Sequence, residues 1–549
     1  MAWYDEAVFY HIYPLGLTGA PKQNDYSEPV HRLRSLLPWI DHIASIGCTA
    51  LYIGPLFESG SHGYDTTDYR KLDSRLGTND DLTEFVAACH QKGIHVIFDG
   101  VFNHTGRDFF AFRDLKEHRE ASRYRDWYVN VNFSGNNEYN DGFSYGNWGG
   151  YNLLARLNQR NPKVQDYICD VIRFWVKEFD VDGIRLDAAD VLDFDFMHRL
   201  RLTADEVKPD FWLMGEVIHG EYGRWVNDAH LHSVTNYQLH KALYSGHNDH
   251  NYFEIAHTVR RFTGDGAQCP AGKLYNFVDN HDVERIYTKL TNKAHFVPVH
   301  ILLYTLPGIP SIYYGSEFGI EGEKRPGGPD DAIRPALKLD DYRDALKANP
   351  CTALIAALGA LRKAEKVLVF GGYRELTLTT TQFAFARSFG GRQVLITVNN
   401  SDHEASFDLP AGSAVRFVGA LFGEKAAASD GRLRVTVGAN SGEVWVPADG
   451  EAPQIDTDAL ASLEDTMRKK AEKEQAEARA KEEALEKTAE GSVSPALSGK
   501  PYEEMTVEEL QAAVLAKMRK NGPVTDEMKR TVFENVYHDS LVNWVKSFR

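Results

Sequence analysis

Short apolar segments alternate with amphipathic helical segments along most of this 549-residue chain. The series begins with the strand-like EAVFYHIYP, the helical PVHRLRSLLPWIDHIASIG, the strand-like TALYIGP, the helical DDLTEFVAACHQKG and the strand-like IHVIFDGVFNH. Five further strand segments follow, GIRLDAA, FWLMGEV, SVTNY, LYNFVDNHD and PSIYYGSEFG, which makes eight. Strand–helix repetition favours a parallel sheet, and eight such units close into a barrel. We therefore predict an α/β fold, a (β/α)8 TIM barrel over residues 1–360.

Three further regions interrupt or follow this alternation. Residues 105–161 lie between the third strand and the next helix, and their Asn, Gly, Tyr and Trp content predicts an inserted subdomain over the barrel mouth. Residues 361–450 alternate apolar and polar residues in QFAFARSF, RQVLITVNN and LRVTVG, which predicts a C-terminal antiparallel β-sandwich. Residues 451–549 predict a helical tail made of a charged spacer and C-terminal helices.

The tail contains two kinds of helical pattern. The run 465–490 has many opposite charges at i,i+4 spacing, so it can be helical without a packed face and is predicted to be a spacer. VEELQAAVLAKM and MKRTVFENVYHDSLVNWVKSF instead have apolar stripes that must be buried, and Thr506 with Glu509 has capping-box spacing. Either these helices pack on each other or on the barrel, or they form a homo-oligomer contact.

Charge and cysteine content exclude several classes of protein. The formal net charge of −17 disfavours nucleic acid and anionic membranes as partners. The five cysteines are scattered without CxxC spacing, which suits reduced thiols rather than disulfides or zinc ligands. The N-terminus lacks the pattern of a signal peptide, and no apolar run is long enough to span a bilayer. We therefore expect a cytoplasmic location, with no membrane partner.

Polar side chains gather where four of the predicted strands end, and the side chains in question are Asp99, Asn103, His104, Arg185, Asp187, Glu216, His281 and Asp282. The carboxyl ends of barrel strands share one face, where barrel enzymes carry out their chemistry. Arg185 and Asp187 are two residues apart on one strand, so their side chains point to the same face. Three carboxylates with two imidazoles and an arginine on that face predict a catalytic site.

The segments DGVFNH, GIRLDAAD, GEV and FVDNHD, in this order, resemble the four signature segments of the α-amylase family of glycoside hydrolases. This resemblance covers about the first 450 residues. It implies that Asp187 is the nucleophile, Glu216 the general acid/base and Asp282 the third carboxylate, which holds the sugar. It also implies that Asp99 and Asn103 maintain the architecture of the site. The substrate-binding residues that it implies are Tyr64, His104, Arg185, His281 and His219.

The implied roles agree with the chemistry of glycosidic bond cleavage. Retention of configuration needs one carboxylate that attacks the anomeric carbon and a second carboxyl, roughly 5–5.5 Å away, that protonates the leaving oxygen. We expect Arg185 to keep Asp187 ionised, and we expect Glu216, among carboxylates and aromatic rings, to have a raised proton affinity. The mechanism needs no cofactor and no metal. The Asp/Asn-rich calcium loop of some relatives is absent from LTGAPKQNDYSEP, so we expect no metal site.

Other segments narrow the expected substrate. LLARLN and SVTNYQLHKAL resemble segments of neopullulanases, cyclomaltodextrinases and maltogenic amylases, although the N-terminal β-domain of those enzymes is expected to be missing. Ala188, directly after the implied nucleophile, is more often associated with α-1,4 than with α-1,6 linkages. We therefore expect a retaining hydrolase of α-1,4-linked glucose units in short malto-oligosaccharides or cyclodextrins, with an oligosaccharide as its partner. An α-glucosyltransferase, transglycosylase or isomerase on the same scaffold is the alternative, whereas a non-catalytic carbohydrate-binding relative would lack the nucleophile or the acid.

Two groups of side chains outside the signature segments are further candidates for contacts with the sugar. The first group is four histidines within 18 residues, His240, His247, His250 and His257. Their spacing is not that of a metal site, so we expect them to line or flank the sugar cleft. The second group is Trp148 and Tyr151 of YGNWGGYN, which either stack on sugar or pack within the insertion.

Overall fold

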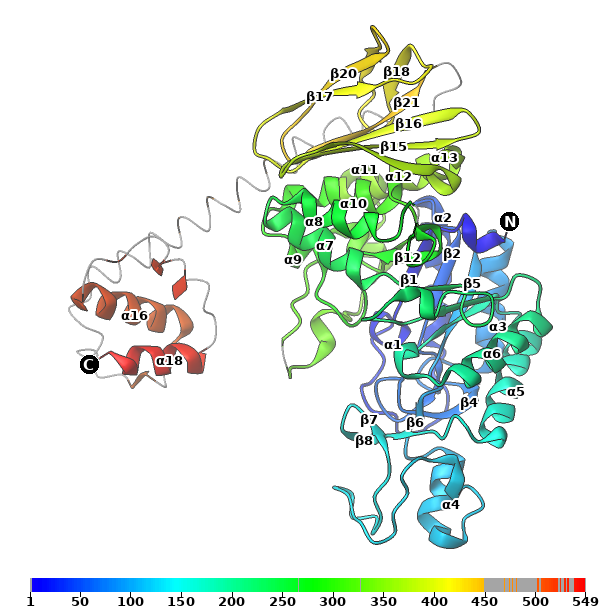
Figure 1. Cartoon of the computed structure of the whole chain (residues 1–549). Helices are drawn as coiled ribbons and strands as arrows, with labels where there is room; N and C mark the ends of the chain where they lie inside the picture. Colours follow the sequence, from blue (N-terminus) through cyan, green and yellow to red (C-terminus); the bar gives the residue numbers. More distant parts are fainter. Residues whose placement is uncertain are drawn as a thin grey trace. The chain divides into compact units, whose positions relative to one another are not determined.

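The computed structural model divides the chain into two compact units, Met1–Asp465 and Thr466–Arg549, and we consider each by itself (Figure 1). In the first unit the structure describes residues 2–448 except 265 and 326. In the second it describes the single positions 469, 473, 476 and 480, then 501–502, 505–521, 524, 528–529, 531–532 and 538–548.

Eight parallel strands form a closed barrel in the first unit. The strands are β1 (Phe9–Ile12), β2 (Ala50–Ile53), β5 (His95–Gly100), β9 (Gly183–Leu186), β10 (Trp212–Gly215), β11 (Ser233–Thr235), β12 (Leu274–Phe277) and β13 (Ile309–Tyr313). The barrel closes because β1 pairs with both β2 and β13. Seven of these strands lie within the segments expected from the sequence, and β13 begins one residue before the expected segment PSIYYGSEFG, so the prediction of a (β/α)8 barrel is confirmed.

Large side chains fill the inside of the barrel. The rings of Phe9 and Trp212 stack with centroids 5.0 Å apart, and Trp212 also lies 6.2 Å from the ring of Tyr275. These three residues belong to one buried cluster with inward-pointing residues of other strands. The interior is therefore a packed core, and a substrate can be bound only at an end of the barrel.

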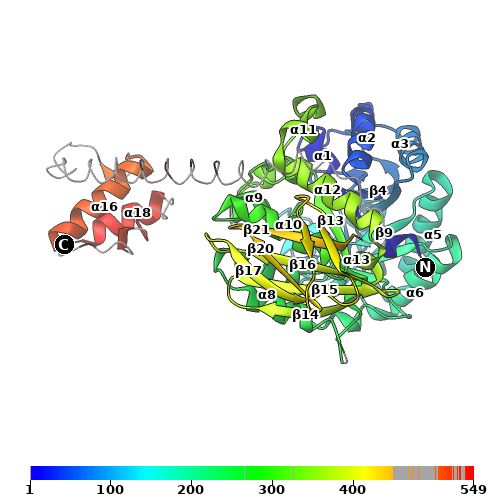
Figure 2. The same cartoon turned by 90° about the horizontal axis from the view of Figure 1, so that it is seen from above.

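Helices cover the outside of the barrel, and Figure 2 shows α2, α3, α5 and α6 following one another around one side. Helix α5 begins after Asn161, whose side chain accepts a hydrogen bond from the backbone of Lys163, and it ends at Asp180 in a left-handed conformation. The helices of this unit are α1 (Pro14–Leu17), α2 (Leu37–Ser45), α3 (Asn79–Gln91), α4 (Phe110–His118), α5 (Pro162–Phe179), α6 (Phe194–Val207), α7 (Tyr237–Asn248), α8 (Tyr252–Arg260), α9 (Ile286–Lys289), α10 (Phe296–Thr305), α11 (Ala345–Ala348), α12 (Pro350–Ala364) and α13 (Lys366–Phe370).

The insertion after β5 contains α4 and a three-stranded sheet of β6 (His104–Thr105), β7 (Asn147–Trp148) and β8 (Tyr151–Arg156). Strand β8 pairs with β6 through His104 and Arg156, so the insertion is anchored beside a predicted site residue. A separate hairpin of β3 (Phe57–Ser59) and β4 (Thr66–Leu72) follows β2. The bounds 105–161 for an independent subdomain stay a prediction.

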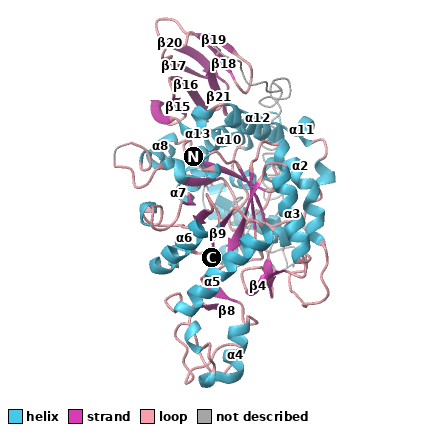
Figure 3. Cartoon of the chain, turned by 90° about the vertical axis from the view of Figure 1, so that its right-hand side faces the viewer, coloured by secondary structure: helices cyan, strands magenta, loops and turns pink. Residues whose placement is uncertain are grey.

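Two antiparallel sheets follow the barrel, and Figure 3 shows them at the opposite end of this unit from α4. Their strands are β14 (Gly372–Leu378), β15 (Gln382–Phe389), β16 (Arg392–Asn399), β17 (Ala405–Pro410), β18 (Arg416–Gly419), β19 (Lys425–Ala427), β20 (Arg432–Val437) and β21 (Ser441–Pro447). Phe407, Leu433 and Trp445 belong to one buried cluster that draws on both sheets. The expected β-sandwich is thus confirmed, although α12 continues to Ala364, past the boundary predicted at residue 360.

The second unit contains α16 (Val507–Asn521) and α18 (His538–Ser547). The backbone of Thr506 donates to Glu509 Oε2 at 2.7 Å, and the backbone of Glu509 donates to Thr506 Oγ1 at 3.2 Å, which confirms the capping box. Apolar residues of both helices, including Leu515 and Leu541, form one buried cluster, so the helices pack on each other. Most of the charged run 465–490 lies outside the described residues. Among the helices that the structure describes, none could cross a membrane.

Candidate active site

Arg185 contacts three of the predicted carboxylates. The parallel register of β5 and β9 places Arg185 beside Asp99, and both are buried. Nη1 of Arg185 donates to Oδ1 of Asp99 and to Oδ1 of Asp187, each at 2.9 Å. Its Nη2 lies 2.9 Å from Oε2 of Glu216. A single guanidinium thus contacts carboxylates from the ends of three neighbouring strands, β5, β9 and β10.

Glu216 lies against the peptide that follows Asp187. The backbone N–H of Ala188 donates to Oε2 of Glu216 at 3.0 Å. Ala188 has a left-handed backbone (φ 47°, ψ 43°), a conformation rare for a residue other than glycine and often found at functional sites. On the other side, the hydroxyl of Tyr237, the first residue of α7, donates to Oε1 at 3.3 Å. The Glu216 carboxyl is therefore held by three groups in one orientation.

Tyr64 bridges Asp99 and His281. Its hydroxyl donates to Oδ2 of Asp99 at 3.0 Å and lies 2.5 Å from Nε2 of His281. The rings of Tyr64 and His281 are nearly parallel, with centroids 5.6 Å apart. Tyr52 donates to the same oxygen of Asp99 at 2.7 Å. Asp99 is only 2% exposed and contacts these side chains and Arg185, so the protein itself occupies its hydrogen-bonding oxygens.

Asp282 contacts two side chains, Arg334 and His281. Nη2 of Arg334 lies 2.9 Å from Oδ1 of Asp282 and 2.8 Å from Oδ2 of Asp330, and Nε2 of His281 lies 3.0 Å from Oδ2 of Asp282. Burial by itself would raise the pKa of Asp282, but its contact with His281 and the charges of Arg334 and Arg185 outweigh burial and hold that pKa well below its usual range. Asp282 is therefore a carboxylate anion beside the two residues that bind it.

The surroundings of Asp187 disfavour the ionised state expected for it. Burial raises the pKa of the Asp187 carboxyl well above its usual range. Arg185 opposes this shift, but the negative charges of Glu216 and Asp99 add to it. Arg185 therefore does not offset the effect of burial and of the neighbouring carboxylates on this pKa, because one guanidinium is shared among three carboxylates, and the ionised state expected for Asp187 stays a prediction.

The remaining predicted residues differ in their placement. His104 is buried, its Nε2 lies 3.0 Å from the carbonyl oxygen of Tyr64, and burial lowers its pKa to about 4, so it is neutral. Asn103 is fully buried and accepts a hydrogen bond from Gln159 at 3.0 Å, beside the site rather than facing it. His219 is exposed and is not brought to the group that surrounds Arg185.

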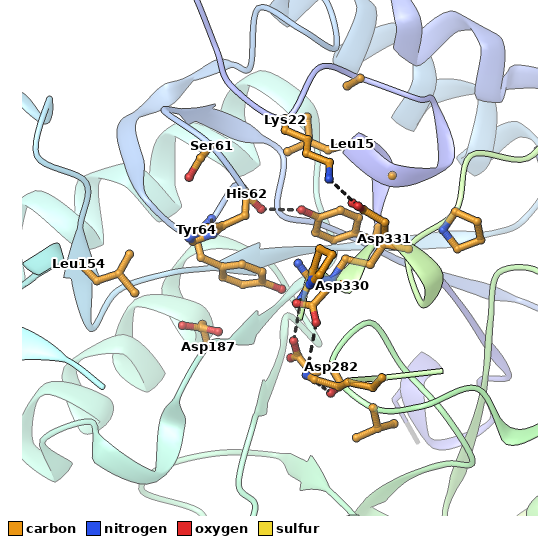
Figure 4. A pocket seen from close by; sticks show the side chains of 18 of the residues that line it. Leu15, Lys22, Ser61, His62, Tyr64, Leu154, Asp187, Asp282, Asp330 and Asp331 are labelled. Atoms are coloured by element: carbon orange, nitrogen blue, oxygen red, sulfur yellow. Dashed lines mark hydrogen bonds and ion pairs between the residues drawn. The ribbon is translucent and has the colours of Figure 1, made fainter. Parts of the chain in front are cut away.

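A cavity of about 910 Å³ opens over these groups (Figure 4). Trp148 and Leu154 of the insertion contribute to its wall, whereas Tyr151 is 68% exposed and does not line it. The lining includes the site residues Tyr64, His104, Asp187, Glu216, Tyr237 and Asp282, and, from the segments after β1 and β13, Leu15, Lys22, Asp330, Asp331 and Arg334. The cavity is therefore framed by the insertion and by the segments that follow the first and last barrel strands.

The histidines of residues 240–257 do not line this cavity, so the lining role expected for them is wrong, whereas His240 flanks it, since its ring lies 6.2 Å from that of the lining residue Tyr237. His240 is buried against Phe277 and contacts the carbonyl oxygen of Val278 at 2.8 Å. His250 contacts the carbonyl oxygen of Asn400, at the end of β16 in the sandwich, at 2.5 Å. His240 therefore belongs to the packing of α7 and His250 to the junction with the sandwich, whereas His257 on α8 is exposed. Among the described residues, no group of three or more His, Cys, Asp or Glu side chains could hold a metal ion.

Three residues that contact the carboxyl groups of the site were not predicted from the sequence. Tyr237 belongs to the segment SVTNYQLHKAL, which resembles a segment of neopullulanases and cyclomaltodextrinases. Its contact with Glu216, however, depends on where α7 begins. Tyr52 lies on β2, which carries none of the signature segments. Arg334 stands in the irregular segment after β13, 52 residues beyond Asp282, and no local sequence pattern connects the two.

Paired carboxyl groups at one end of a (β/α)8 barrel, with a third carboxylate beside them, define the class of barrel glycoside hydrolases. Residues 32–353 match the α-amylase catalytic domain family. A cyclomaltodextrinase of Geobacillus thermopakistaniensis is 30% identical over 412 residues, which is 74% of this chain and 68% of that protein. An intracellular maltogenic amylase of Bacillus subtilis is 30% identical over 355 residues, 63% of this chain and 57% of that protein. A solved cyclomaltodextrinase superposes with a TM-score of 0.71 at 25% identity, covering 81% of this chain and 78% of its own.

The chain belongs to the α-amylase family of glycoside hydrolases.

Proposed function

We propose that this protein is a retaining α-glycoside hydrolase that acts on α-1,4-linked glucose units of short malto-oligosaccharides or cyclodextrins. The observation that carries the proposal is the placement of Asp187 and Glu216 on one guanidinium, at 2.9 Å each, with Glu216 also bound to the peptide after Asp187. This arrangement supports the close spacing that a nucleophile and an acid/base need for retention, rather than the wider spacing that leaves room for water between them.

In the first step, the Asp187 carboxylate attacks the anomeric carbon while Glu216 transfers its proton to the leaving glycosidic oxygen. The bond that breaks releases the leaving sugar, and the bond that forms gives a glucosyl-aspartate. In the second step Glu216 takes a proton from water, the water oxygen attacks the anomeric carbon, and Asp187 leaves as the carboxylate.

The reaction requires the proton of this pair to reside on Glu216 when substrate is bound. We propose that the glycosidic oxygen, as a hydrogen-bond acceptor beside Glu216, draws the proton there, since Arg185 contacts both carboxyl groups and can stabilise either as the anion. Asp282, held as an anion, is placed to accept hydrogen bonds from sugar hydroxyls, and His104 and Tyr64, which also line the cavity, are proposed to contact the same sugar. His281 is 1% exposed and does not line the cavity, and its proposed contact with the sugar rests on the family resemblance alone. His219, which is exposed, is proposed to contact only a longer substrate.

The substrate class is supported by the names of the relatives, a cyclomaltodextrinase and an intracellular maltogenic amylase. The second name also supports a cytoplasmic location for this protein. A homo-oligomer formed through the C-terminal helices is a further proposal, although the apolar stripes of α16 and α18 are buried against each other, so a second copy would have to bind the remaining surface of this helix pair. Light scattering of the full chain and of a chain without residues 455–549 tests it, and equal subunit numbers would exclude it.

The site assignment is tested by two isosteric variants, Asp187→Asn and Glu216→Gln. Each should lower kcat on maltotriose by at least a factor of about a thousand, because each removes one member of the acid–nucleophile pair. Asp195→Asn and Glu221→Gln are matched controls, since both side chains are exposed near the same strands. Near wild-type hydrolysis by either site variant would contradict the assignment. Proton NMR of the first products should show the α-anomer, and a β-anomer would contradict retention.

A further inference from the structure

The cavity is bounded on the side of Asp282 by two chain segments that contact each other, residues 15–22 after β1 and residues 329–337 after β13. We propose that these segments form an end wall that closes the cleft beyond the sugar attacked by Asp187, so that the enzyme cleaves near the non-reducing ends of chains and not within them. This inference rests on the proposed function and narrows it, because a cyclodextrin has no non-reducing end: of the two proposed substrate classes, it selects linear malto-oligosaccharides.

The direction of the chain follows from the position of the acid. The departing sugar must lie on the side of Glu216, because the leaving oxygen takes the proton of that carboxyl. Tyr237 and Ile218 border the cavity near Glu216. The sugar that remains on Asp187 continues in the opposite direction, toward Asp282. Figure 4 shows Asp330, Asp331 and Lys22 on that side of the cavity and Leu154 on the other.

The backbone of the end wall is held by buried contacts. The guanidinium of Arg75, which is 4% exposed, donates to the carbonyl oxygens of Pro21 at 2.8 Å and Lys22 at 3.3 Å. Arg75 is itself held by two hydrogen bonds of 2.8 Å to the carboxylate of Asp73. These contacts fix the backbone of the segment after β1.

The segment after β13 is joined to the first segment along its backbone. The N–H of Leu337 donates to the carbonyl oxygen of Leu17 at 3.3 Å. At Gly16 a Cβ atom would clash with the carbonyl oxygen of Arg334, so the two backbones approach as closely as a glycine permits. The same Arg334 binds Asp282 at 2.9 Å, which connects the end wall to the catalytic carboxylates.

An ion pair between Lys22 and Asp331 joins the outer rims of the two segments (Figure 4). Their side chains are 71% and 59% exposed, so the pair contributes little to stability and can be removed without unfolding the protein. Its effect is steric, because the two side chains meet across the path that a longer glucan chain would follow out of the cavity.

The test compares p-nitrophenyl maltoheptaoside with the same compound blocked by an ethylidene group on its terminal non-reducing glucose. If the end wall closes the cleft, the wild-type protein cleaves the blocked compound at less than about one hundredth of the unblocked rate, a difference of about 2.7 kcal/mol in the barrier. Equal rates on the two compounds would overturn the proposal. Released nitrophenyl-saccharides are identified by mass, so that cleavage at every bond is counted.

The ion pair is tested by a double variant, Lys22→Ala with Asp331→Ala. We expect its blocked-to-unblocked rate ratio to rise at least fivefold over wild type, because the rim is opened. The matched control is Asp166→Ala with Arg199→Ala, an exposed ion pair between α5 and α6 with a separation of 2.8 Å, which should leave the ratio unchanged. An unchanged ratio in the first double variant would overturn the role of this pair.

Hydrolysis of maltotriose distinguishes failure of the proposed function from failure of the end wall. Hydrolysis of maltotriose together with equal cleavage of both heptaosides would mean that the proposed function holds and the end wall does not act. Failure to hydrolyse maltotriose would remove the proposed function, and the end-wall proposal with it.

Discussion

The hydroxyl of Tyr237 lies 3.3 Å from Oε1 of Glu216, on the side of that carboxyl opposite Arg185. Asn280 donates to the same hydroxyl at 3.1 Å, so the hydrogen of Tyr237 is directed to Glu216. Tyr237 is thereby a positioning residue for the proposed acid/base, and its own position is fixed by the start of α7.

Replacing Tyr237 by Phe should lower kcat about tenfold without loss of the fold, because a hydrogen bond to a group that is charged in part of the cycle contributes roughly 1.5–3 kcal/mol. Steady-state kinetics on maltotriose measure the loss. Tyr244→Phe is the matched control on the same helix, where the ring lies near Lys289 and not at the site. Equal kcat values for wild type and Tyr237→Phe would show that Arg185 and Ala188 suffice to orient Glu216.

Glu443 of β21 should make the folded protein less stable as the pH rises. Burial raises its pKa to about 7, against an ordinary value of 4.5, although the backbone N–H groups of Leu421, Phe422 and Val444 donate to it. The folded state therefore binds this proton more tightly than the unfolded state. Its contribution is complete below about pH 4.5 and is lost as the pH rises toward 7, by up to about 1.4 kcal/mol per pH unit.

Glu443→Gln should abolish that contribution, and thermal unfolding at several pH values between 4.5 and 8 measures it. The exposed Glu404 in the same sandwich gives a matched control, Glu404→Gln. If the pH dependence of Tm is the same in wild type and Glu443→Gln, Glu443 does not retain its proton in the folded protein.

Buried histidines should make the folded protein less stable as the pH falls. Burial lowers the pKa to about 4 for His104, His232, His240, His295 and His300. The unfolded chain protonates such residues near pH 6.5, so stability is lost as the pH falls from about 6.5 toward 4. Each histidine contributes up to about 1.4 kcal/mol per pH unit in this range.

His300→Leu isolates one of these contributions. His300 is fully buried on α10, where its Nδ1 contacts the carbonyl oxygen of Phe296, an oxygen that also lies within the helix hydrogen-bond ladder. The variant should therefore unfold with a shallower loss of stability between pH 6.5 and 4 than wild type. His403→Leu, at an exposed position, should keep the wild-type slope. Identical slopes for His300→Leu and wild type would refute this origin of acid lability.

The sequence predicts the barrel well because apolar residues recur at different spacings in strands and in helices, and because the strand–helix unit occurs eight times. It also predicts that Asp99, Arg185, Asp187 and Glu216 lie together, because residues at the carboxyl ends of parallel strands share one edge. These predictions depend on local patterns plus one rule of topology.

The missed or misjudged features depend on distances that no local pattern encodes. Arg334 reaches Asp282 from an irregular segment, and His240 and His250 contact the carbonyl oxygens of Val278 and Asn400 instead of lining the cavity. The protonation of Asp187 likewise could not be read from its neighbour Arg185, since it depends on how many carboxylates share that guanidinium and on burial.

The most direct test of the account is to trap the covalent intermediate in Glu216→Gln with α-glucosyl fluoride, whose fluoride leaves without a proton. Because this variant lacks the base that activates water, the intermediate should accumulate. Intact mass spectrometry should show one added glucosyl group, and peptide mapping should place it on Asp187, while Asp187→Asn with Glu216→Gln should remain unlabelled. Release of fluoride without any glucosylated protein, or a glucosyl group on another residue, would contradict Asp187 as the nucleophile.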